Sequence, residues 1–169
     1  RQVVEQCALP MVLDADGLNA IVGFREILRR REAPTILTPH PGEAARLFDS
    51  SSGEIQRTRV EFARRTAGEN NVVLILKGHQ TLVASPDGEV FVNSSGNPGM
   101  ASGGSGDVLT GMVSALLAQQ YDPVVAACLG VFLHGLAGDL AGEEVGIEGL
   151  GADDILAAVP AAFRRLREA

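Results

Sequence analysis

The sequence is poor in aromatic residues, with six Phe, one Tyr and no Trp in 169 positions. A hydrophobic core must therefore be built from Leu, Val, Ile and Ala. Hydrophobic residues make up 46% of the chain, which is enough for one compact domain or most of one.

Cysteine is also scarce. Only Cys7 and Cys128 are present, far apart in the chain, and no Cys-x-x-Cys or Cys/His ligand spacing occurs. This excludes the usual zinc-site signatures, and we expect two reduced, buried thiols.

Positive charge is in the minority, because 14 Lys and Arg face 21 Asp and Glu for a formal net charge of −7. Such a balance does not favour a nucleic-acid-binding face. No apolar run approaches the roughly 20 residues of a membrane span, and no signal peptide is visible. We therefore expect a cytoplasmic protein without a nucleic-acid or membrane partner. Since the chain opens with Arg1 and not Met, we expect a piece of a longer protein.

Strands and helices are predicted to alternate. Short apolar strands are expected at 11–13, 35–37 and 72–76, and a hairpin at 81–84 and 89–92 around Pro86-Asp87-Gly88. Helices are expected at 3–9, 18–31, 55–66, 107–119, 124–141 and 152–168, the last broken at Pro160. This order predicts an α/β layered domain with a mostly parallel sheet, in which the unbroken apolar run 72–76 is buried on both faces.

Two local signals refine these helices. Ser51 and Glu54 have the spacing of a capping box before the helix at 55–66. The run Arg29-Arg30-Arg31 is interpreted as a solvated helix end.

The most informative segment is a glycine-rich loop, Asn93–Gly106, that leads into an apolar helix. Glycines let a backbone approach phosphate closely, and a helix N-terminus offers free N–H groups and a favourable dipole. The loop is neither Gly-x-x-x-x-Gly-Lys-Ser/Thr nor Gly-x-Gly-x-x-Gly, because Leu109 stands where the third glycine should be. It predicts phosphate binding without a P-loop or a Rossmann site.

Asp107 directly follows this loop. An acid in the first helical turn often only complements the helix dipole or caps N–H groups. Beside a bound phosphate, however, a carboxylate is unfavourable unless it has another task, and accepting the proton of an attacking hydroxyl is such a task. Asp107 is therefore the candidate catalytic base.

Three further segments end strands, where open α/β sheets bind ligands. Lys77–Thr81 is either a polar turn or a nucleotide cradle. Two prolines restrict the backbone of Thr38–Glu43. If this segment only begins a helix, that would account for the presence of Glu43 in the first turn but not for the presence of His40. Asp14 and Asp16 are candidates for water-mediated Mg²⁺ binding or for helix capping. His134 lies on an apolar helix and is interpreted as a buried or interface histidine rather than a catalytic one.

The segment Asn97–Leu109 resembles the signature of the ADP/ATP-dependent NAD(P)H-hydrate dehydratases of the ribokinase-like superfamily. Leu13–Asn19, Thr38–Glu43 and Lys77-Gly78 resemble other motifs of that family in the same order, so the resemblance covers nearly the whole chain. It implies a ribokinase-like three-layer α/β/α fold that lacks its N-terminal strands. Residues 1–169 would then form the C-terminal major part of a single dehydratase domain.

The resemblance implies a reaction and a set of residues. Hydrated NADH or NADPH would be phosphorylated on its ring hydroxyl by ADP or ATP, and loss of phosphate would restore the double bond. Asp107 would be the catalytic base and contact substrate, His40 would bind substrate, and Glu43 would orient Mg²⁺. The nucleotide would be held by Lys77, Gly78, His79, Gln80, Thr81, Gly103, Gly104, Ser105 and Gly106. A homotetramer is expected.

Two alternatives remain open from the sequence. The same loop suits a small-molecule kinase of this fold that acts on a vitamin precursor such as a hydroxymethylpyrimidine or a thiazole. A non-catalytic nucleotide-binding module is the alternative from another class, although a pure binder has no use for Asp107. The choice between ADP and ATP is not encoded in a backbone cradle.

Overall fold

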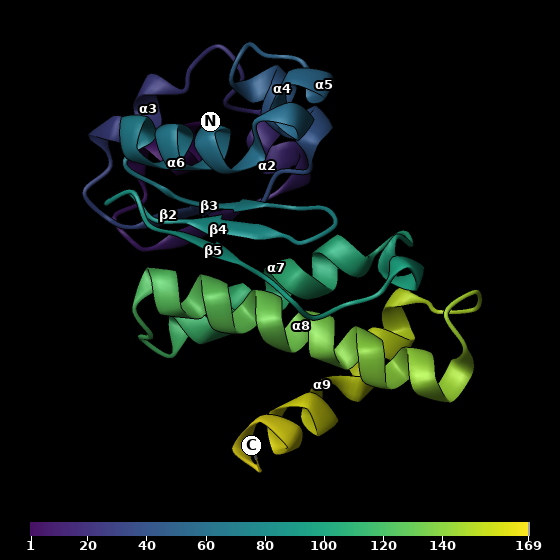
Figure 1. Ribbon diagram of the computed structural model, residues 1–169. Coiled ribbons are helices and arrows are strands. Elements are labelled where there is room, and N and C mark those ends of the chain that lie inside the picture. The colour runs from purple at the N-terminus through teal and green to yellow at the C-terminus, as the bar shows by residue number, and fades with distance from the viewer. Residues whose placement is uncertain (169) are drawn as a thin grey trace.

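A computed structural model describes residues 1–168, and it places one five-stranded sheet between two groups of helices (Figure 1). The sheet order follows the chain: β1 (Met11–Leu13), β2 (Thr35–Leu37), β3 (Val73–Leu76), β4 (Leu82–Ala84) and β5 (Val90–Val92). The first three strands are parallel, and β3, β4 and β5 pair antiparallel through the predicted hairpin. All strands except β4 therefore point the same way.

The first helical group covers one face of the sheet. It comprises α1 (Gln2–Gln6), α2 (Ala15–Asn19), α3 (Glu26–Arg30), α4 (Pro41–Leu47), α5 (Ser52–Arg57) and α6 (Arg59–Asn70). The second group, α7 (Ser105–Ala118), α8 (Pro123–Val145) and α9 (Ala152–Arg167), lies on the opposite face. There α7 and α8 contact the strands, and α9 packs on α7 and α8 as the outermost element.

The central strand β3 joins two hydrophobic cores. Leu74 and Leu76 face the cluster under the first helices, whereas Val73 and Ile75 face the cluster under α7 and α8. All four side chains are buried. The prediction that this apolar run is buried on both faces is confirmed, and the α/β layered fold class with it.

Two helix predictions are wrong. Residues 18–31 form two short helices, because the chain turns between them and Gly23 adopts a φ of +78°. Residues 152–167 form one continuous helix with Pro160 inside it. Proline removes the hydrogen bond to the carbonyl four residues earlier, but that residue, Leu156, is exposed, so water can replace the lost donor.

The predicted capping box is only half formed. The Ser51 hydroxyl caps α5 by accepting the backbone N–H of Glu54, but the Glu54 carboxylate accepts the Ser50 hydroxyl instead of closing the box. A break at Thr58 separates α5 from α6.

Arg31 is not solvated as predicted. It is buried, and its guanidinium donates to the carbonyl oxygens of Val4, Cys7 and Leu9 and to the Thr35 hydroxyl. Because guanidinium donors in a fixed fork suit several acceptors at once, Arg31 fastens the N-terminal segment to the start of β2.

The expectation that no apolar run reaches membrane-spanning length is also wrong. Helix α8 has 23 residues and, by length and composition alone, is long and apolar enough to cross a membrane. Half of its most apolar part is buried against the rest of the chain, as in a core helix. Both cysteines are free thiols, and each is partly rather than fully buried.

Candidate functional site

The carboxyl ends of β1, β2 and β3 lie side by side and are joined by hydrogen bonds among the residues at and just after the strand ends. The backbone N–H and hydroxyl of Thr38 both donate to the carbonyl oxygen of Leu13, at 3.1 and 3.2 Å. The backbone N–H of Lys77 donates to the carbonyl oxygen of Pro39 at 2.9 Å. Parallel strands place these ends at one edge, so the segments beginning at Asp14, Thr38 and Lys77 form one surface.

A charged network crosses this edge. Lys77 Nζ donates to Asp14 Oδ1 at 2.8 Å, and the Thr110 hydroxyl of α7 donates to Asp14 Oδ2 at 2.8 Å. Burial alone would raise the pKa of the Asp14 carboxyl, but these hydrogen bonds and the charge of Lys77 outweigh it and lower the pKa below its ordinary value. Asp14 therefore ties the first strand to α7.

The start of α7 is the predicted anion site. Gly104, at its N-cap, has a φ of +87°, a conformation that glycine adopts without strain. Within residues 1–168 the backbone N–H groups of Gly103, Gly104 and Gly106 donate to no acceptor. Free amides at the first turn of a 14-residue helix are the arrangement that binds phosphate.

Lys77 adds positive charge to this turn. Its Nζ lies 3.4 Å from the place that a Cβ on Gly106 would occupy. The ammonium group is thus held by Asp14 against the glycine backbone, with 20% of its side chain exposed. A phosphate on the free amides would have this charge close by.

Asp107 is the third residue of α7, and its side chain is exposed. No side-chain hydrogen bond caps α7, and the Asp107 carboxylate has no hydrogen-bond or ion-pair partner in the part of the chain that the structure describes. The capping interpretation therefore finds no support in these contacts, and the carboxylate stands free beside the amides.

His40 and Glu43 form a reciprocal helix cap. His40 Nδ1 accepts the backbone N–H of Gly42 at 2.9 Å, and Glu43 Oε2 accepts the backbone N–H of His40 at 2.8 Å. Helix entry thus accounts for His40 as well as Glu43, contrary to our expectation. Because Nδ1 is an acceptor, the proton of the neutral ring lies on Nε2, and about half of this side chain is exposed.

Glu43 is buried, and its Oε2 also lies 3.8 Å from Lys77 Nζ. The described residues contain no group of three or more His, Cys, Asp or Glu that would hold a metal by themselves.

Asp14 does not cap α2, since its carboxylate accepts hydrogen bonds from Lys77 and Thr110. The Asp16 carboxylate accepts the side-chain amide of Asn19, at 3.4 Å.

The turn after β3 is shaped by Arg59 of α6. Its guanidinium donates to the carbonyl oxygens of Leu76 and Gln80, at 3.3 and 3.4 Å, and comes within 3.0 Å of the place that a Cβ on Gly78 would occupy. Gly78 has a φ of +137°, and the Thr81 hydroxyl donates to its carbonyl oxygen. Gly78, His79 and Gln80 remain exposed at the rim.

Helix α8 supports the first half of the glycine loop. Asn97 Nδ2 donates to the carbonyl oxygen of Gly138 at 2.9 Å, and Asp139 Oδ2 accepts the backbone N–H of Gly96 at 2.8 Å. The Ser95 hydroxyl donates to the carbonyl oxygen of Phe132. A Cβ on Gly135 would lie 2.7 Å from the carbonyl carbon of Ser95, so this close approach requires glycine.

His134 of α8 contacts the second half of the loop. Its Nε2 lies 3.0 Å from the carbonyl oxygen of Ser105 and 3.4 Å from the Ser105 hydroxyl. Burial lowers the pKa of His134, and the contact with the Ser105 carbonyl partly offsets that effect. His134 is thus a partly buried histidine that touches the site, where we predicted a buried or interface one.

Three contributors to the site were not predicted from the sequence: Thr110, Arg59 and Asp139. Helix periodicity places Thr110 one turn after Gly106, on the same face, and this was the one available signal. The other contacts join residues that are 17 to 43 positions apart, and no local pattern marks them.

Comparison with known proteins agrees with this geometry. The family model for NAD(P)H-hydrate dehydratase matches residues 2–161. A bifunctional NAD(P)H-hydrate repair enzyme from Moorella thermoacetica is 45% identical over 168 residues, which are 99% of this chain and 32% of the relative.

Two solved structures support the fold. The ADP/ATP-dependent NAD(P)H-hydrate dehydratase from Bacillus subtilis, co-crystallised with ATP/Mg²⁺, is 38% identical with a TM-score of 0.82, over 92% of this chain and 55% of that one. A ribokinase-like superfamily protein from Enterococcus faecalis is 25% identical with a TM-score of 0.66, over 96% of this chain and 65% of that one. The predicted ribokinase-like architecture is confirmed.

This chain spans 30% to 50% of the length of the first curated relatives it matches. The match to the family model nevertheless runs across almost all of it and includes the strand ends, the glycine loop and α7. The chain belongs to the NAD(P)H-hydrate dehydratase family.

Proposed function

We propose that the protein carrying this chain uses ADP or ATP to convert hydrated NADH or NADPH back to NADH or NADPH. One observation carries the proposal: three free amides and the ammonium group of Lys77 surround the first turn of α7, while the Asp107 carboxylate stands free in that same turn. A phosphate-binding turn with an adjacent base suits phosphoryl transfer to a hydroxyl.

The chemistry follows from these groups. The ring hydroxyl of the hydrate attacks the terminal phosphorus of the nucleotide, and Asp107 takes the hydroxyl proton. The P–O bond to the nucleotide breaks, which leaves a phosphate ester on the ring. The ester C–O bond then breaks, the neighbouring carbon loses a proton, and inorganic phosphate departs as the double bond is restored.

The chain's own residues would promote the first step by binding charge. The amides of Gly103, Gly104 and Gly106 would hold the oxygens on which negative charge develops, and Ser105 shares their turn. Lys77 would neutralise part of that charge. Gly78, His79, Gln80 and Thr81 would line the nucleotide at the rim shaped by Arg59.

His40 would bind the hydrated nicotinamide. Its Nδ1 is fixed by the N–H groups of α4, so Nε2–H, which lies 3.6 Å from Glu43 Oε2, is the group that would donate to a substrate oxygen. The cap also holds the ring orientation without help from substrate.

Mg²⁺ fits this edge of the sheet as an ion held mainly by nucleotide phosphates and water, because the Asp14 and Glu43 carboxylates already have partners and Asp107 is assigned to the substrate hydroxyl. Glu43 would orient it through water, since its Oε2 accepts the His40 amide and lies near Lys77. When bound with nucleotide, the ion neutralises phosphate charge.

The remaining proposals concern the whole protein. Residues 1–169 would form the C-terminal major part of one dehydratase domain. A cytoplasmic location agrees with two free thiols. A homotetramer agrees with exposed apolar side chains on α8 and α9, among them Val125, Leu156 and Leu166.

The test is a repair assay on the whole protein. Hydrated NADH is mixed with Mg²⁺ and with ADP, ATP or no nucleotide, and the absorbance of the reduced nicotinamide is followed. We expect recovery only when a nucleotide is present. A stable phosphorylated vitamin precursor, formed without any hydrate repair, would identify a small-molecule kinase instead. Tight nucleotide binding without turnover of any substrate would identify a binding module.

A further inference from the structure

Lys77 brings its charge to a place where a cation is disfavoured. Its ammonium group lies 3.4 Å from the place that a Cβ on Gly106 would occupy, at the first turn of the 14-residue helix α7. The positive end of the helix dipole and the free N–H groups repel a cation at this turn. Because a lysine side chain is long and flexible, it stays there only if a negative partner holds it.

Asp14 is this partner. Its Oδ1 accepts from Lys77 Nζ at 2.8 Å, and water competes little for the pair because only 10% of the Asp14 side chain is exposed. An ammonium group carries three N–H donors, so this bond leaves two others for a phosphate oxygen on the free amides of α7. Asp14 therefore holds Lys77 in place without using all of its donors.

Thr110 fixes the second oxygen of Asp14. It lies one helical turn after Gly106, is partly buried, and its hydroxyl donates to Asp14 Oδ2 at 2.8 Å. A threonine hydroxyl inside a helix commonly donates to a carbonyl oxygen of the preceding turn, whereas this hydroxyl is directed to another element. Since each carboxylate oxygen has its own donor, the Asp14 carboxylate cannot rotate without losing both hydrogen bonds.

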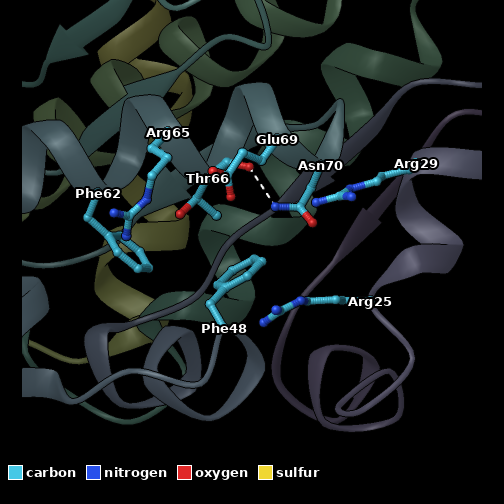
Figure 2. A pocket seen from close by; sticks show the side chains of 8 residues that line it. All are labelled: Arg25, Arg29, Phe48, Phe62, Arg65, Thr66, Glu69 and Asn70. Carbon is cyan, nitrogen blue, oxygen red and sulfur yellow. Dashed lines mark hydrogen bonds between the residues drawn. The ribbon is translucent and has the colours of Figure 1, made fainter.

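Other cations are poorly placed to replace Lys77. A cavity beside α6 is lined by three arginines, Arg25, Arg29 and Arg65 (Figure 2). This cavity lies next to Asn70, shortly before β3 begins, whereas Lys77 follows the other end of that strand. Arg59 contacts the turn after Lys77, but carbonyl oxygens of that turn accept its hydrogen bonds. Among the described residues, positive charge at the first turn of α7 therefore depends on Lys77.

We propose that Thr110 is a positioning residue for nucleotide binding, which acts through Asp14 to hold the ammonium group of Lys77 at the phosphate-binding turn. This role rests on the proposed function, in which the phosphates of ADP or ATP bind at that turn. Without the Thr110 hydroxyl, the Asp14 carboxylate loses one of its two donors and can rotate. Glu43, whose Oε2 lies 3.8 Å from Lys77 Nζ, then competes for the ammonium group. The consequence is weaker phosphate binding, while the base Asp107 is untouched.

Calorimetric titration of the whole protein with ADP and Mg²⁺, without hydrated NADH, tests this role in a double-mutant cycle. Thr110→Val keeps the shape of the side chain and removes the hydroxyl, and we expect ADP to bind about 3- to 10-fold more weakly, the worth of one hydrogen bond. Lys77→Met should weaken ADP binding about 10-fold or more. Adding Thr110→Val to Lys77→Met should have no further effect, because the group that Thr110 positions is gone.

Two further variants separate the hydroxyl from the helix. Thr110→Ser keeps the donor and should retain most of the affinity for ADP. Ser114→Ala is the matched control, because Ser114 lies one turn further along α7 and its side chain makes no hydrogen bond within residues 1–168. It should leave ADP binding unchanged.

An equal loss from Thr110→Val in the unaltered protein and in Lys77→Met would show that Thr110 supports α7 itself, and it would overturn the proposal. Unchanged or tighter ADP binding by Thr110→Val would do the same. If Thr110→Val does not fold, Thr110→Ala takes its place in the cycle.

The repair assay separates this role from the proposed function. For Thr110→Val, the KM for nucleotide should rise by a factor similar to the loss of affinity, with little change in kcat. An unaltered protein that binds ADP but repairs no hydrate would contradict the proposed function alone, and the cycle would still decide the role of Thr110. An unaltered protein that does not bind ADP would overturn both.

Discussion

His134 Nε2 lies 3.0 Å from the carbonyl oxygen of Ser105, so a partly buried side chain of α8 holds the first residue of α7. Burial lowers the pKa of this histidine below its ordinary value, which favours the neutral ring, and in the tautomer with its proton on Nε2 the ring donates to that carbonyl. The contact fixes the turn whose amides form the candidate phosphate site.

Replacing His134 by Leu should loosen this turn. Loss of one hydrogen bond is worth about 0.5–1.5 kcal/mol, so we expect the KM for nucleotide to rise about 3- to 10-fold with a smaller change in kcat. His134→Gln keeps an amide donor and should recover part of the loss. Steady-state kinetics with nucleotide varied measures both. If His134→Leu folds and leaves both constants unchanged, the contact does not position the site.

Asp107→Asn removes the proposed base but keeps its size. We expect kcat to fall by about 10²–10⁴ while nucleotide binding stays within a few-fold, because the amides that bind phosphate are untouched. Asp153→Asn, an exposed acid in the first turn of α9, is the matched control and should keep full activity. Full activity of Asp107→Asn would show that another group takes the proton.

The Asp14 network makes stability depend on pH. Its folded pKa is lowered from the ordinary value of 3.8, so the unfolded chain binds the proton more tightly and the network stabilises the fold above that value. This contribution is lost as pH falls through the folded pKa. Asp14→Asn should therefore cost about 1–3 kcal/mol of unfolding free energy at pH 7, and progressively less as the pH falls below 3.8.

Urea unfolding at a series of pH values measures this difference. Asp16→Asn serves as its control, because Asp16 is exposed two positions away and its carboxylate accepts the side-chain amide of Asn19. A constant difference between Asp14→Asn and the unaltered protein across the whole pH range would contradict the assigned ion pair.

Gly135→Ala should move the glycine loop. The added Cβ would lie 2.7 Å from the carbonyl carbon of Ser95, and backbone cannot yield as a side-chain tip does. We expect a loss of about 1–3 kcal/mol in stability, together with weaker nucleotide binding. Gly111→Ala is the opposite case, since nothing lies within 4 Å of its Cβ, and it should stabilise α7 by about 0.5–1 kcal/mol. Thermal unfolding of both variants distinguishes the two effects: steric crowding lowers the melting temperature of Gly135→Ala, whereas higher helix propensity raises that of Gly111→Ala.

Local patterns predicted much of this molecule. The apolar run of β3 and the hairpin are determined by neighbouring residues, and both appear as expected. The glycine loop was found in the same way. Its partners were not, because Thr110 meets Asp14 across 96 positions, and that contact exists only once α7 has packed under β1.

The wrong predictions have a similar cause. The sequence around Arg31 predicts a solvated, charged helix end, but carbonyl oxygens of a distant segment accept hydrogen bonds from its guanidinium. Pro160 reads as a helix break, yet packing of α9 on α8 keeps the helix continuous. In both cases, contacts with residues distant in the sequence outweigh the local preference of the segment.

Helix α8 is apolar on almost every side, so hydrophobicity alone does not decide which side faces the loop. Its rotation is instead set by Gly135, by the Phe132 and Gly138 carbonyls, and by Asp139. Deleting one residue of α8 before Phe132 would rotate these groups about the helix axis by about 100° and shift them along it by about 1.5 Å, while the helix would stay equally hydrophobic. The candidate phosphate-binding loop therefore also fixes the rotation of α8 about its own axis.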